Sequence, residues 1–593
     1  MSTNISGEKR EALLSKIAEI KTFIEKNAED KNAAQLLSYL GDLSREVNGK
    51  KYGLVFEEHR EKIDELLEKN APVFTEEKKL FVDNGGELNF LLEGDNLASL
   101  KLLEKTHRGK IDVIYIDPPY NTGNKDFIYD DDFVDNEDSF RHSKWLSFMK
   151  PRLVIAKKLL SDSSAIFISI DDNEQSHLKV LCDEIFGERN YIGNIIIKSN
   201  PRGSMSDAEL ANLHEYLLVY AKKIDSVNIL GQELSDDMID EYKLEDEHGR
   251  YRLLGLRMRG GFWKRSERPN LYFPIYVNPK NCSISIEKKE NYSDSVLPIQ
   301  PSTMEDGTWR WSKEKIEKEA KYLIAKKIKR GEETVWDIYQ KDYFEKEGER
   351  KTKTRSIWDK KELNYQNGTI EIKNIFGDSK VFNYSKPVQL IQEVVKIMGL
   401  SSSPTILDFF AGSGTTGHAV LKLNAEDGGH RKFILCTNNE NNICRDITYQ
   451  RLKTAITGKR KDKSKYSDGL PGSLKYFKTD FIPISEKMYY EYADELLLHV
   501  RELVELENAV NFDKDASVAI VLDDDEMEEF IKRIVGSSPT MTGCSPTMTV
   551  DSPIKTLYLG HDVLLSSKQE RILKALNISV NVIPDYYYRE LAL

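Results

Sequence analysis

Asp117, Pro118, Pro119 and Tyr120 form a corner in the sequence whose side chains could carry out chemistry. The corner follows an apolar run at 111–116, rich in β-branched and aromatic residues, which predicts an interior parallel strand. Proline cannot donate to a ladder and restricts the residue before it, so the strand must end here. We therefore expect the corner at the carboxyl end of a strand, where open α/β sheets bind ligands. An isolated Asp-Pro is also typical of a plain surface turn.

A second motif, ILDFFAGSGTTGHAV, occupies residues 406–420. An apolar strand runs into Asp408, and Gly412, Gly414 and Gly417 then satisfy GxGxxG spacing before a helical segment. This strand, turn and helix together predict a nucleotide-like ligand lying against the turn. The Gly-Lys-Ser/Thr ending of a Walker loop is absent, so a triphosphate is not expected.

Two cofactors suit this turn, a nicotinamide dinucleotide and S-adenosylmethionine. Glu440 follows the next predicted strand, where an acid can hydrogen-bond ribose hydroxyls. The Asp-Pro-Pro-Tyr corner favours S-adenosylmethionine, because hydride transfer has no evident use for it. An exocyclic amine is a poor nucleophile, and Asp117 with the Pro118 carbonyl could accept its two N–H bonds and localise the lone pair. If the amine belongs to a nucleic-acid base, Tyr120 could stack on that base, which has to leave its duplex to reach the site.

The two motifs, with DPPY at 117–120 preceding DFFAGSGTT at 408–416, resemble the circularly permuted β group of amino-methylating DNA methyltransferases. The segments GDNLASLKLL, NLHEYLLVYAKK and FNYSKPVQLI further resemble the modification subunit of type III restriction-modification systems. The resemblance implies transfer of a methyl group from S-adenosylmethionine to N6 of a flipped-out adenine in double-stranded DNA. It also implies an α/β fold: a circularly permuted Rossmann-like methyltransferase domain, an inserted target-recognition domain, and helical N- and C-terminal regions.

The resemblance also implies a set of site residues. The catalytic loop would be Asp117, Pro118, Pro119 and Tyr120. Contacts to S-adenosylmethionine would come from Asp408, Phe410, Gly412, Gly414, Thr415, Glu440, Lys386 and Asp95. Lys386 resembles part of the motif on the methionine side of the cofactor, whereas Asp95 is equally well explained as a helix N-cap. No metal is expected, because the sulfonium donor is already activated.

A basic island at 250–268 stands out in an acidic chain of net charge −12. It carries seven Arg or Lys against one Glu and lies in a polar, aromatic stretch without α/β alternation. The resemblance makes this stretch the target-recognition domain, where arginine reads guanine edges and basic side chains neutralise phosphates. The expected DNA-binding residues are Arg257, Arg259, Lys264, Arg265 and Arg268. The plain alternative is a solvated basic loop.

The pattern of predicted elements divides the chain into five regions. These are a helical N-terminal region at 1–80, the catalytic half of the methyltransferase domain at 81–225, the target-recognition domain at 226–375, the cofactor-binding half at 376–480, and a C-terminal region at 481–593. The resemblance implies that the terminal regions serve a homodimer and contact a restriction subunit, a helicase-nuclease, since no nuclease or ATPase motif is present.

Composition limits the setting of this activity. The chain has no uncharged apolar stretch of ~18 residues, and its five cysteines form no CxxC pair, so we expect a soluble cytoplasmic protein with no membrane contact. Three alternatives stay open. They are a solitary adenine or cytosine-N4 methyltransferase, a nicotinamide-dependent oxidoreductase, and a DNA-binding protein with a vestigial pocket.

Overall fold

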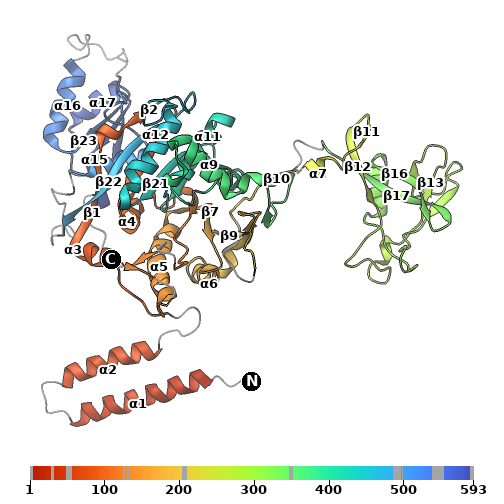
Figure 1. The fold of residues 1–593 in the computed structure, drawn as a ribbon, viewed down its shortest axis with the longest axis horizontal. Helices are drawn as coiled ribbons and strands as arrows, with labels where there is room; N and C mark the ends of the chain where they lie inside the picture. Colours follow the sequence, from red (N-terminus) through yellow and green to blue (C-terminus); the bar gives the residue numbers. More distant parts are fainter. Residues whose placement is uncertain are drawn as a thin grey trace. The chain divides into compact units, whose positions relative to one another are not determined.

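The structure, a computed structural model, divides into two compact units (Figure 1). One unit contains Met1–Asn228 and Ser356–Leu593, and the other contains Ile229–Arg355. The residues described are 5–27, 33–48, 56–123, 127–129, 132–134, 137–203, 210–234, 236–345, 351–484, 496, 498–536 and 553–587.

An eleven-stranded sheet forms the centre of the first unit as described. Its strand order is β1 (Asn70–Glu76), β22 (Ser473–Pro483), β3 (Leu88–Glu93), β21 (Lys432–Thr437), β20 (Thr405–Asp408), β4 (Ile111–Ile116), β7 (Leu160–Ile170), β9 (Glu215–Ala221), β8 (Tyr191–Ile197) and β19 (Ile357–Trp358), with β2 (Val82–Asp83) beside β22. From β22 to β7 all neighbours are parallel. The central strands are buried along almost their whole length, as expected for a parallel sheet covered on both faces.

Strand β20, from late in the chain, lies between β21 and β4. The strand that precedes the glycine turn therefore belongs to the same sheet as the strand that precedes the DPPY corner, although the second unit separates them in sequence. This is the circular permutation that the motif order predicts. The Rossmann-like α/β prediction is thus confirmed.

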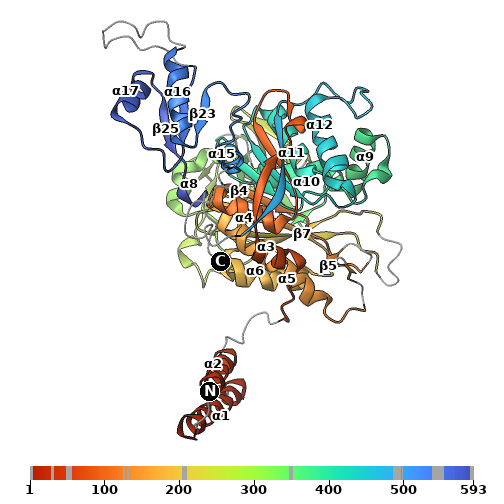
Figure 2. The same ribbon diagram turned by 90° about the vertical axis from the view of Figure 1, so that its left-hand side faces the viewer.

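Two groups of helices pack on the sheet, on opposite sides in Figure 2. One group is α3 (Lys62–Lys69), α4 (Asn96–His107), α5 (Arg141–Leu159) and α6 (Gln175–Phe186), and the other is α9 (Tyr365–Phe376), α10 (Val388–Ile397), α11 (Thr415–Asp427) and α12 (Tyr449–Thr457). Helix α10 shows why they dock, because its apolar residues recur at helical spacing and bury one face, including Leu390, Ile391 and Val394.

The sheet is parallel only between β22 and β7, and antiparallel strands flank this part on both sides. On one side, β1 and β2 run antiparallel to β22. The other side contains β9 and β8. Strand β9 runs antiparallel to both β7 and β8. The connection from β8 to β9, at 198–214, contains no helix in its described part, so it makes no parallel crossover and the neighbouring strands reverse direction.

The second unit has its own core, built on small antiparallel sheets. One contains β11 (Leu244–Asp246), β12 (Gly249–Gly255), β17 (Glu333–Tyr343) and β16 (Leu323–Arg330), another contains β14 (Ile284–Ser285), β13 (Ile275–Val277) and β15 (Asp294–Val296), and β10 (Gln232–Glu233) pairs with β18 (Lys351–Thr352). Helices α7 (Asp236–Ile239) and α8 (Lys313–Glu319) complete it. The unit ends at Arg355 rather than at 375, because β19 pairs with β8 of the main sheet and α9 packs beside α12.

The terminal regions are only partly helical. Helices α1 (Ile5–Asn27) and α2 (Ala33–Asn48) pack on each other, but β1 from the same region joins the main sheet. After α15 (Val500–Asn508), the C-terminal part forms a parallel sheet of β23 (Val518–Val521), β24 (Thr556–Leu559) and β25 (Ser579–Val582), with α16 (Asp524–Gly536) and α17 (Ser567–Ala575). The prediction of a helical C-terminal region was therefore incomplete, since these short apolar strands bury a separate core.

The structure describes most of the cysteines and the helices on which the composition-based expectations rest. Cys182, Cys282, Cys436 and Cys444 are free thiols, and Cys544 lies outside the described residues. In the part of the chain that is described, every helix is too short or too polar to cross a bilayer.

Candidate active site

The carboxyl ends of four neighbouring parallel strands bring most of the expected site residues together. In sheet order β3, β21, β20 and β4, these ends are followed by Asp95, Glu440, Asp408 and Asp117. The sequence spreads these acids over more than half of the chain, and the strand order makes them neighbours along one edge. This edge is where an open α/β sheet binds its ligand.

Two cavities open along this edge and share the DPPY corner. One, of about 440 Å³, is lined by Asp95 and Glu440, and the other, of about 530 Å³, is lined by Tyr120, Lys386 and the glycine turn. Both are bounded by Asp117, Pro119, Phe410 and Gly412. An elongated ligand can therefore extend past Asp117, with one end in each cavity.

Asp117 belongs to a buried polar network that the sequence did not predict. The Lys386 Nζ lies 3.1 Å from Asp117 Oδ1 and 3.0 Å from Glu215 Oε2. The Tyr120 hydroxyl lies 2.9 Å from each of these same oxygens, and Lys386 donates to it over 2.6 Å. Lys386 also donates to the Tyr365 hydroxyl over 2.8 Å. The network fixes the Asp117 carboxylate and the Tyr120 ring relative to each other.

In this network, burial and the neighbouring charges shift the pKa values of Lys386 and Glu215 in opposite directions. Burial alone would lower the pKa of Lys386, but the Asp117 and Glu215 carboxylates outweigh it and raise that pKa above its ordinary value. Burial also raises the pKa of Glu215 to about 7, against the opposing effect of Lys386. Lys386 is therefore a permanent cation, whereas Glu215 can take up a proton near neutral pH.

Contacts outside the network hold the corner from behind. The indole Nε1 of the fully buried Trp145 donates to the Pro119 carbonyl over 2.8 Å. Asn121 follows with a φ of +57°, a left-handed conformation that asparagine tolerates better than most residues. The corner is thus a rigid loop and not a plain surface turn.

The glycine turn has the conformation that its motif requires. Gly412 and Gly414 have φ of +47° and +78°, where side chains are disfavoured. At Gly417 the constraint is packing, since an added Cβ would lie 2.7 Å from Leu452 Cδ2. The first two glycines therefore shape the turn, of which Gly412 lines both cavities, and the third allows α11 to approach its neighbours.

Two expected cofactor acids have identifiable structural roles. Asp408 Oδ1 accepts the Phe410 N–H over 3.0 Å and Oδ2 accepts the Thr416 hydroxyl over 2.5 Å, so Asp408 braces the glycine turn. Burial raises the pKa of Asp408 to about 7. Asp95 is the N-cap of α4, with Oδ1 accepting from Leu97 N over 2.8 Å. Its other oxygen, Oδ2, lies 3.6 Å from Nη2 of the buried Arg152, and Asp95 also lines the 440 Å³ cavity.

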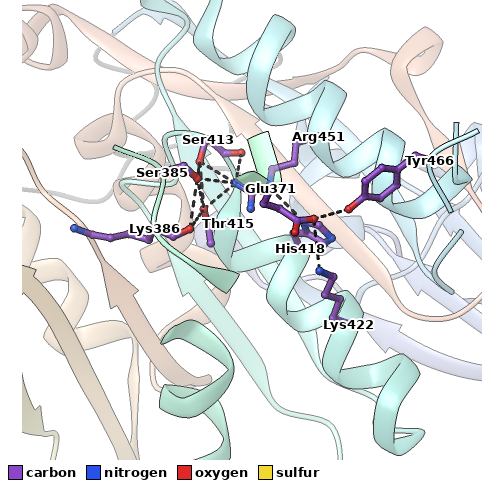
Figure 3. Close-up of polar contacts among 9 residues, drawn as sticks. All are labelled: Glu371, Ser385, Lys386, Ser413, Thr415, His418, Lys422, Arg451 and Tyr466. Atoms are coloured by element: carbon purple, nitrogen blue, oxygen red, sulfur yellow. Dashed lines mark hydrogen bonds and ion pairs between the residues drawn. The ribbon is translucent and has the colours of Figure 1, made fainter. Parts of the chain in front are cut away.

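A fully buried arginine supports the turn from the opposite side (Figure 3). Arg451 Nη1 donates to Ser385 Oγ, Ser413 Oγ and Thr415 Oγ1 over 3.1, 3.0 and 2.9 Å. Thr415 in turn donates to the Lys386 carbonyl over 3.4 Å. Arg451 therefore ties the glycine turn to the segment that carries Lys386.

Sequence reasoning missed Glu215, Tyr365 and Arg451. Glu215 offered one signal, an acid that opens an otherwise apolar strand (EYLLVYA). Tyr365 and Arg451 offered none, since a tyrosine at a helix start and a basic residue in a helix are ordinary. Lys386 was expected at the cofactor, and the structure places its side chain at the catalytic corner.

The expected DNA-binding residues separate into two kinds within the second unit. Arg257 is 7% exposed, is paired with Asp337, and donates to the Ile299 carbonyl over 2.7 Å, so its role is structural. The others lie on an exposed loop after β12, beside the 64% exposed Phe262; they are Arg259, Lys264, Arg265 and Arg268. Burial could not be read from the sequence, where all five look alike.

The site can be tested for its fit to S-adenosylmethionine. The bare glycine turn offers backbone to an elongated ligand, acids lie near one end of the paired cavities, and Phe410 lies between them. These features fit a nucleoside joined to an amino acid, with the DPPY corner at the junction. A permuted α/β sheet with this turn and this corner defines a methyltransferase that uses S-adenosylmethionine.

Comparison with known proteins gives the family. A family model described as DNA methylase matches residues 111–450, more than half of the chain. The chain belongs to this DNA methylase family. The predictions of a DNA methyltransferase and of S-adenosylmethionine as its cofactor are therefore confirmed, and the oxidoreductase alternative is excluded.

Individual relatives differ in how much of their length is matched. The chain is 39% identical to the type II methyltransferase M.KpnI of Klebsiella pneumoniae, over 66% of this chain and 90% of that protein. It is 38% identical to the EcoPI Mod subunit, a type III restriction-modification enzyme of Escherichia phage P1, over 60% of this chain and 58% of that subunit. It is 33% identical to the StyLTI Mod subunit of Salmonella typhimurium, over 61% of this chain and 54% of that subunit. The matches thus span little more than half of each Mod subunit.

Proposed function

We propose that this protein is a site-specific DNA methyltransferase that modifies N6 of adenine in duplex DNA, as the modification and recognition subunit of a type III restriction-modification system. The main support for this reaction is the position of Asp117, which lines both cavities. Asp117 forms an ion pair with Lys386 and accepts a hydrogen bond from Tyr120. The similarity to Mod subunits supports the assignment to a type III system. Such a protein acts in the cytoplasm.

The corner is built to make an aromatic amine nucleophilic. Lys386 and Tyr120 both contact Asp117 Oδ1, so Oδ2 is left to accept one N–H of the target amine. The Pro118 carbonyl accepts the other N–H, which localises the nitrogen lone pair out of the base plane. Bound S-adenosylmethionine supplies a methyl group activated by its sulfonium. The precise placement of donor and acceptor is the main contribution of the protein.

The buried cation keeps the corner ready for this step. The Lys386 ammonium lies 3.1 Å from Asp117 Oδ1 and holds the Asp117 side chain in place as a hydrogen-bond acceptor. As the N–C bond forms, the amine becomes cationic and must lose a proton. Asp117 is its first acceptor, and Tyr120 links Asp117 to Glu215, which can hold a proton near neutral pH.

Cofactor residues divide between the two cavities. Asp95 and Glu440 face the nucleoside in the 440 Å³ cavity. The turn faces the methionyl part in the other cavity with Gly412 and Thr415, and Gly414 gives the turn its shape. Phe410 packs between the two ends. Asp408 acts by bracing this turn.

The second unit is the proposed target-recognition domain. Its exposed basic loop carries Arg268 near the Phe262 ring and Lys264 near the Trp263 ring, which suits contact with phosphates and unstacked bases. Arg259 and Arg265 extend the same surface. Arg257 is left out, because it supports the core of the unit.

A solitary methyltransferase is the second candidate. The match that covers 90% of a type II methyltransferase favours it, because the same chain spans only 58% of a Mod subunit. The type III proposal adds a homodimer and a helicase-nuclease partner. The type III proposal predicts a helicase-nuclease reading frame next to the gene, and its absence would favour the solitary enzyme. Where the reading frame is found, co-expression of both proteins followed by size-exclusion chromatography separates the two candidates. A stable complex supports the type III assignment, and separate elution of both proteins contradicts it.

The substrate base is identified by nucleoside analysis. Genomic DNA from an unmodified host is incubated with the protein and S-adenosylmethionine labelled on the methyl group. Label in N6-methyladenine is the expected result. Label in N4-methylcytosine would contradict the choice of base but keep the enzyme class, and no label with the cofactor bound would contradict the proposed reaction.

A further inference from the structure

A cluster of possible metal ligands lies behind the catalytic corner and lines neither cavity. His142 lies in the first turn of α5, Glu174 is the N-cap of α6, and His177 follows in its first turn. His142 Nδ1 is 2.6 Å from Glu174 Oε1, and His177 Nδ1 is 3.2 Å from Glu174 Oε2. Among the described residues, this is the only group of three or more His, Cys, Asp or Glu with ligand atoms within 4.8 Å of one another.

The centre of this cluster is buried and incompletely satisfied. Glu174 is 0% exposed, and its Oε1 accepts from Asn121 Nδ2 over 2.6 Å. Its Oε2 forms no hydrogen bond, and neither does His177 Nδ1 or the buried Asn121 Oδ1. Buried polar atoms without partners are costly, so three of them in one place call for a common partner. Carboxylate, imidazole and amide groups can all bind the same metal ion.

The approach to the cluster is open on the histidine side. The two imidazoles are 36% and 39% exposed and stack with centroids 4.4 Å apart, and both turn Nδ1 toward the same carboxylate. An ion can therefore arrive from solvent and be held against a buried anion. Two imidazoles and one carboxylate match the ligand set of zinc sites, whereas Mg²⁺ and Ca²⁺ prefer oxygen ligands alone.

We infer that His142, Glu174 and His177 form a binding site for a divalent transition-metal ion of the zinc class. The ion would join the first turns of α5 and α6 behind the loop that follows Tyr120, because Asn121 contacts Glu174 directly. Its role is structural, and it lies outside the methyl-transfer step. This site is hard to predict from the sequence, because His142 comes from another helix and only the Glu-x-x-His spacing places two ligands on one helix face.

Metal binding to the full chain tests this site directly. Metal-free protein is titrated with Zn²⁺ in competition with a chromophoric chelator, and with Co²⁺ followed by its visible absorption. His177→Gln removes one donor whose Nδ1 forms no hydrogen bond, so the fold should tolerate it. His430→Gln is the matched control, since His430 Nδ1 lies 2.9 Å from Glu87 in an exposed His–Glu pair that has no second histidine.

Wild type and His430→Gln should bind one ion per chain with equal affinity, and His177→Gln should bind it at least about tenfold more weakly. Zn²⁺ should also raise the melting temperature of wild type and not that of His177→Gln. His142→Gln provides a second test if His177→Gln does not fold. Equal affinity of wild type and both ligand variants, or no stoichiometric binding by wild type, would overturn the inference. None of these readouts requires methyltransferase activity.

Discussion

Replacing Lys386 with methionine tests the network at the catalytic corner. The lysine side chain is 7% exposed and joins Asp117 to Glu215. Methionine fills a similar volume without the charge and leaves two carboxylates around the Tyr120 hydroxyl. Two close carboxylates in a buried site cannot both stay ionised. Glu215, whose pKa burial already raises to about 7, should therefore become protonated in the folded variant.

The expected loss of stability follows from this protonation. The ordinary pKa of the glutamate is 4.5, so holding it protonated in the variant at pH 9 costs about 1.4 kcal/mol for each of 4.5 pH units, or about 6 kcal/mol. In wild type the pKa of Glu215 is about 7, so only the first 2.5 of these units apply, or about 3.5 kcal/mol. The variant should therefore be less stable than wild type by about 3 kcal/mol at pH 9. A carboxyl whose pKa is raised on folding favours the folded state only at low pH. At pH 5.5 Glu215 is protonated in both proteins, so the difference due to this group should nearly vanish. For a unit of this size, about 3 kcal/mol lowers the melting temperature by about 3 °C.

The assay is thermal unfolding of wild type and Lys386→Met at both pH values. Adding Glu215→Gln to the variant removes the unpaired carboxylate and should restore most of the loss at pH 9. Lys360→Met is the matched control, because Lys360 pairs with Glu393 over 2.9 Å at the surface and should cost less than about 1 kcal/mol at either pH. An equal loss at both pH values, or no rescue by Glu215→Gln, would refute the reasoning.

Three further predictions concern the glycine turn, the basic loop and the core of the second unit. Gly414→Ala places a side chain at a φ of +78° and 3.1 Å from Thr448 Cγ2, so it should weaken S-adenosylhomocysteine binding about tenfold in calorimetry, and unchanged affinity would contradict the role of the turn. Arg268→Ala should leave the melting temperature unchanged and reduce the salt dependence of DNA binding by about one unit of log–log slope, whereas an unchanged slope removes Arg268 from the interface. Arg257→Met should instead destabilise the second unit by about 3 kcal/mol, because it leaves the buried Asp337 with only the longer 3.4 Å contact to Arg330, and a wild-type melting curve would contradict that structural role.

The sequence was a good guide wherever a local pattern determines the backbone. The DPPY corner follows a strand because prolines end it, and the glycine turn has the φ values that only glycine adopts readily. These two features depend on residues close together in the chain, so they can be inferred without tertiary contacts. That the strands of both motifs share a sheet was implied by the family resemblance and not by any local pattern.

The contacts that complete the site depend on residues far apart in sequence. Glu215 meets Lys386 only because β9 lies in the same sheet as β4, and Arg451 reaches the glycine turn from α12. Arg257 and Arg268 carry the same charge, but Arg257 forms a buried ion pair and Arg268 is exposed. Burial and ion pairing are set by packing, which composition and spacing do not reveal.

The central claim, that Asp117 directs methyl transfer to an aromatic amine, is tested most directly by single-turnover transfer from labelled S-adenosylmethionine to unmodified genomic DNA. Wild type and Asp117→Ala are compared at equal cofactor occupancy, which calorimetry with S-adenosylhomocysteine establishes. We predict label in N6-methyladenine with wild type and a loss of at least about a thousandfold in rate with the variant, equivalent to about 4 kcal/mol of transition-state stabilisation. Transfer by Asp117→Ala at a rate close to that of wild type would contradict the account.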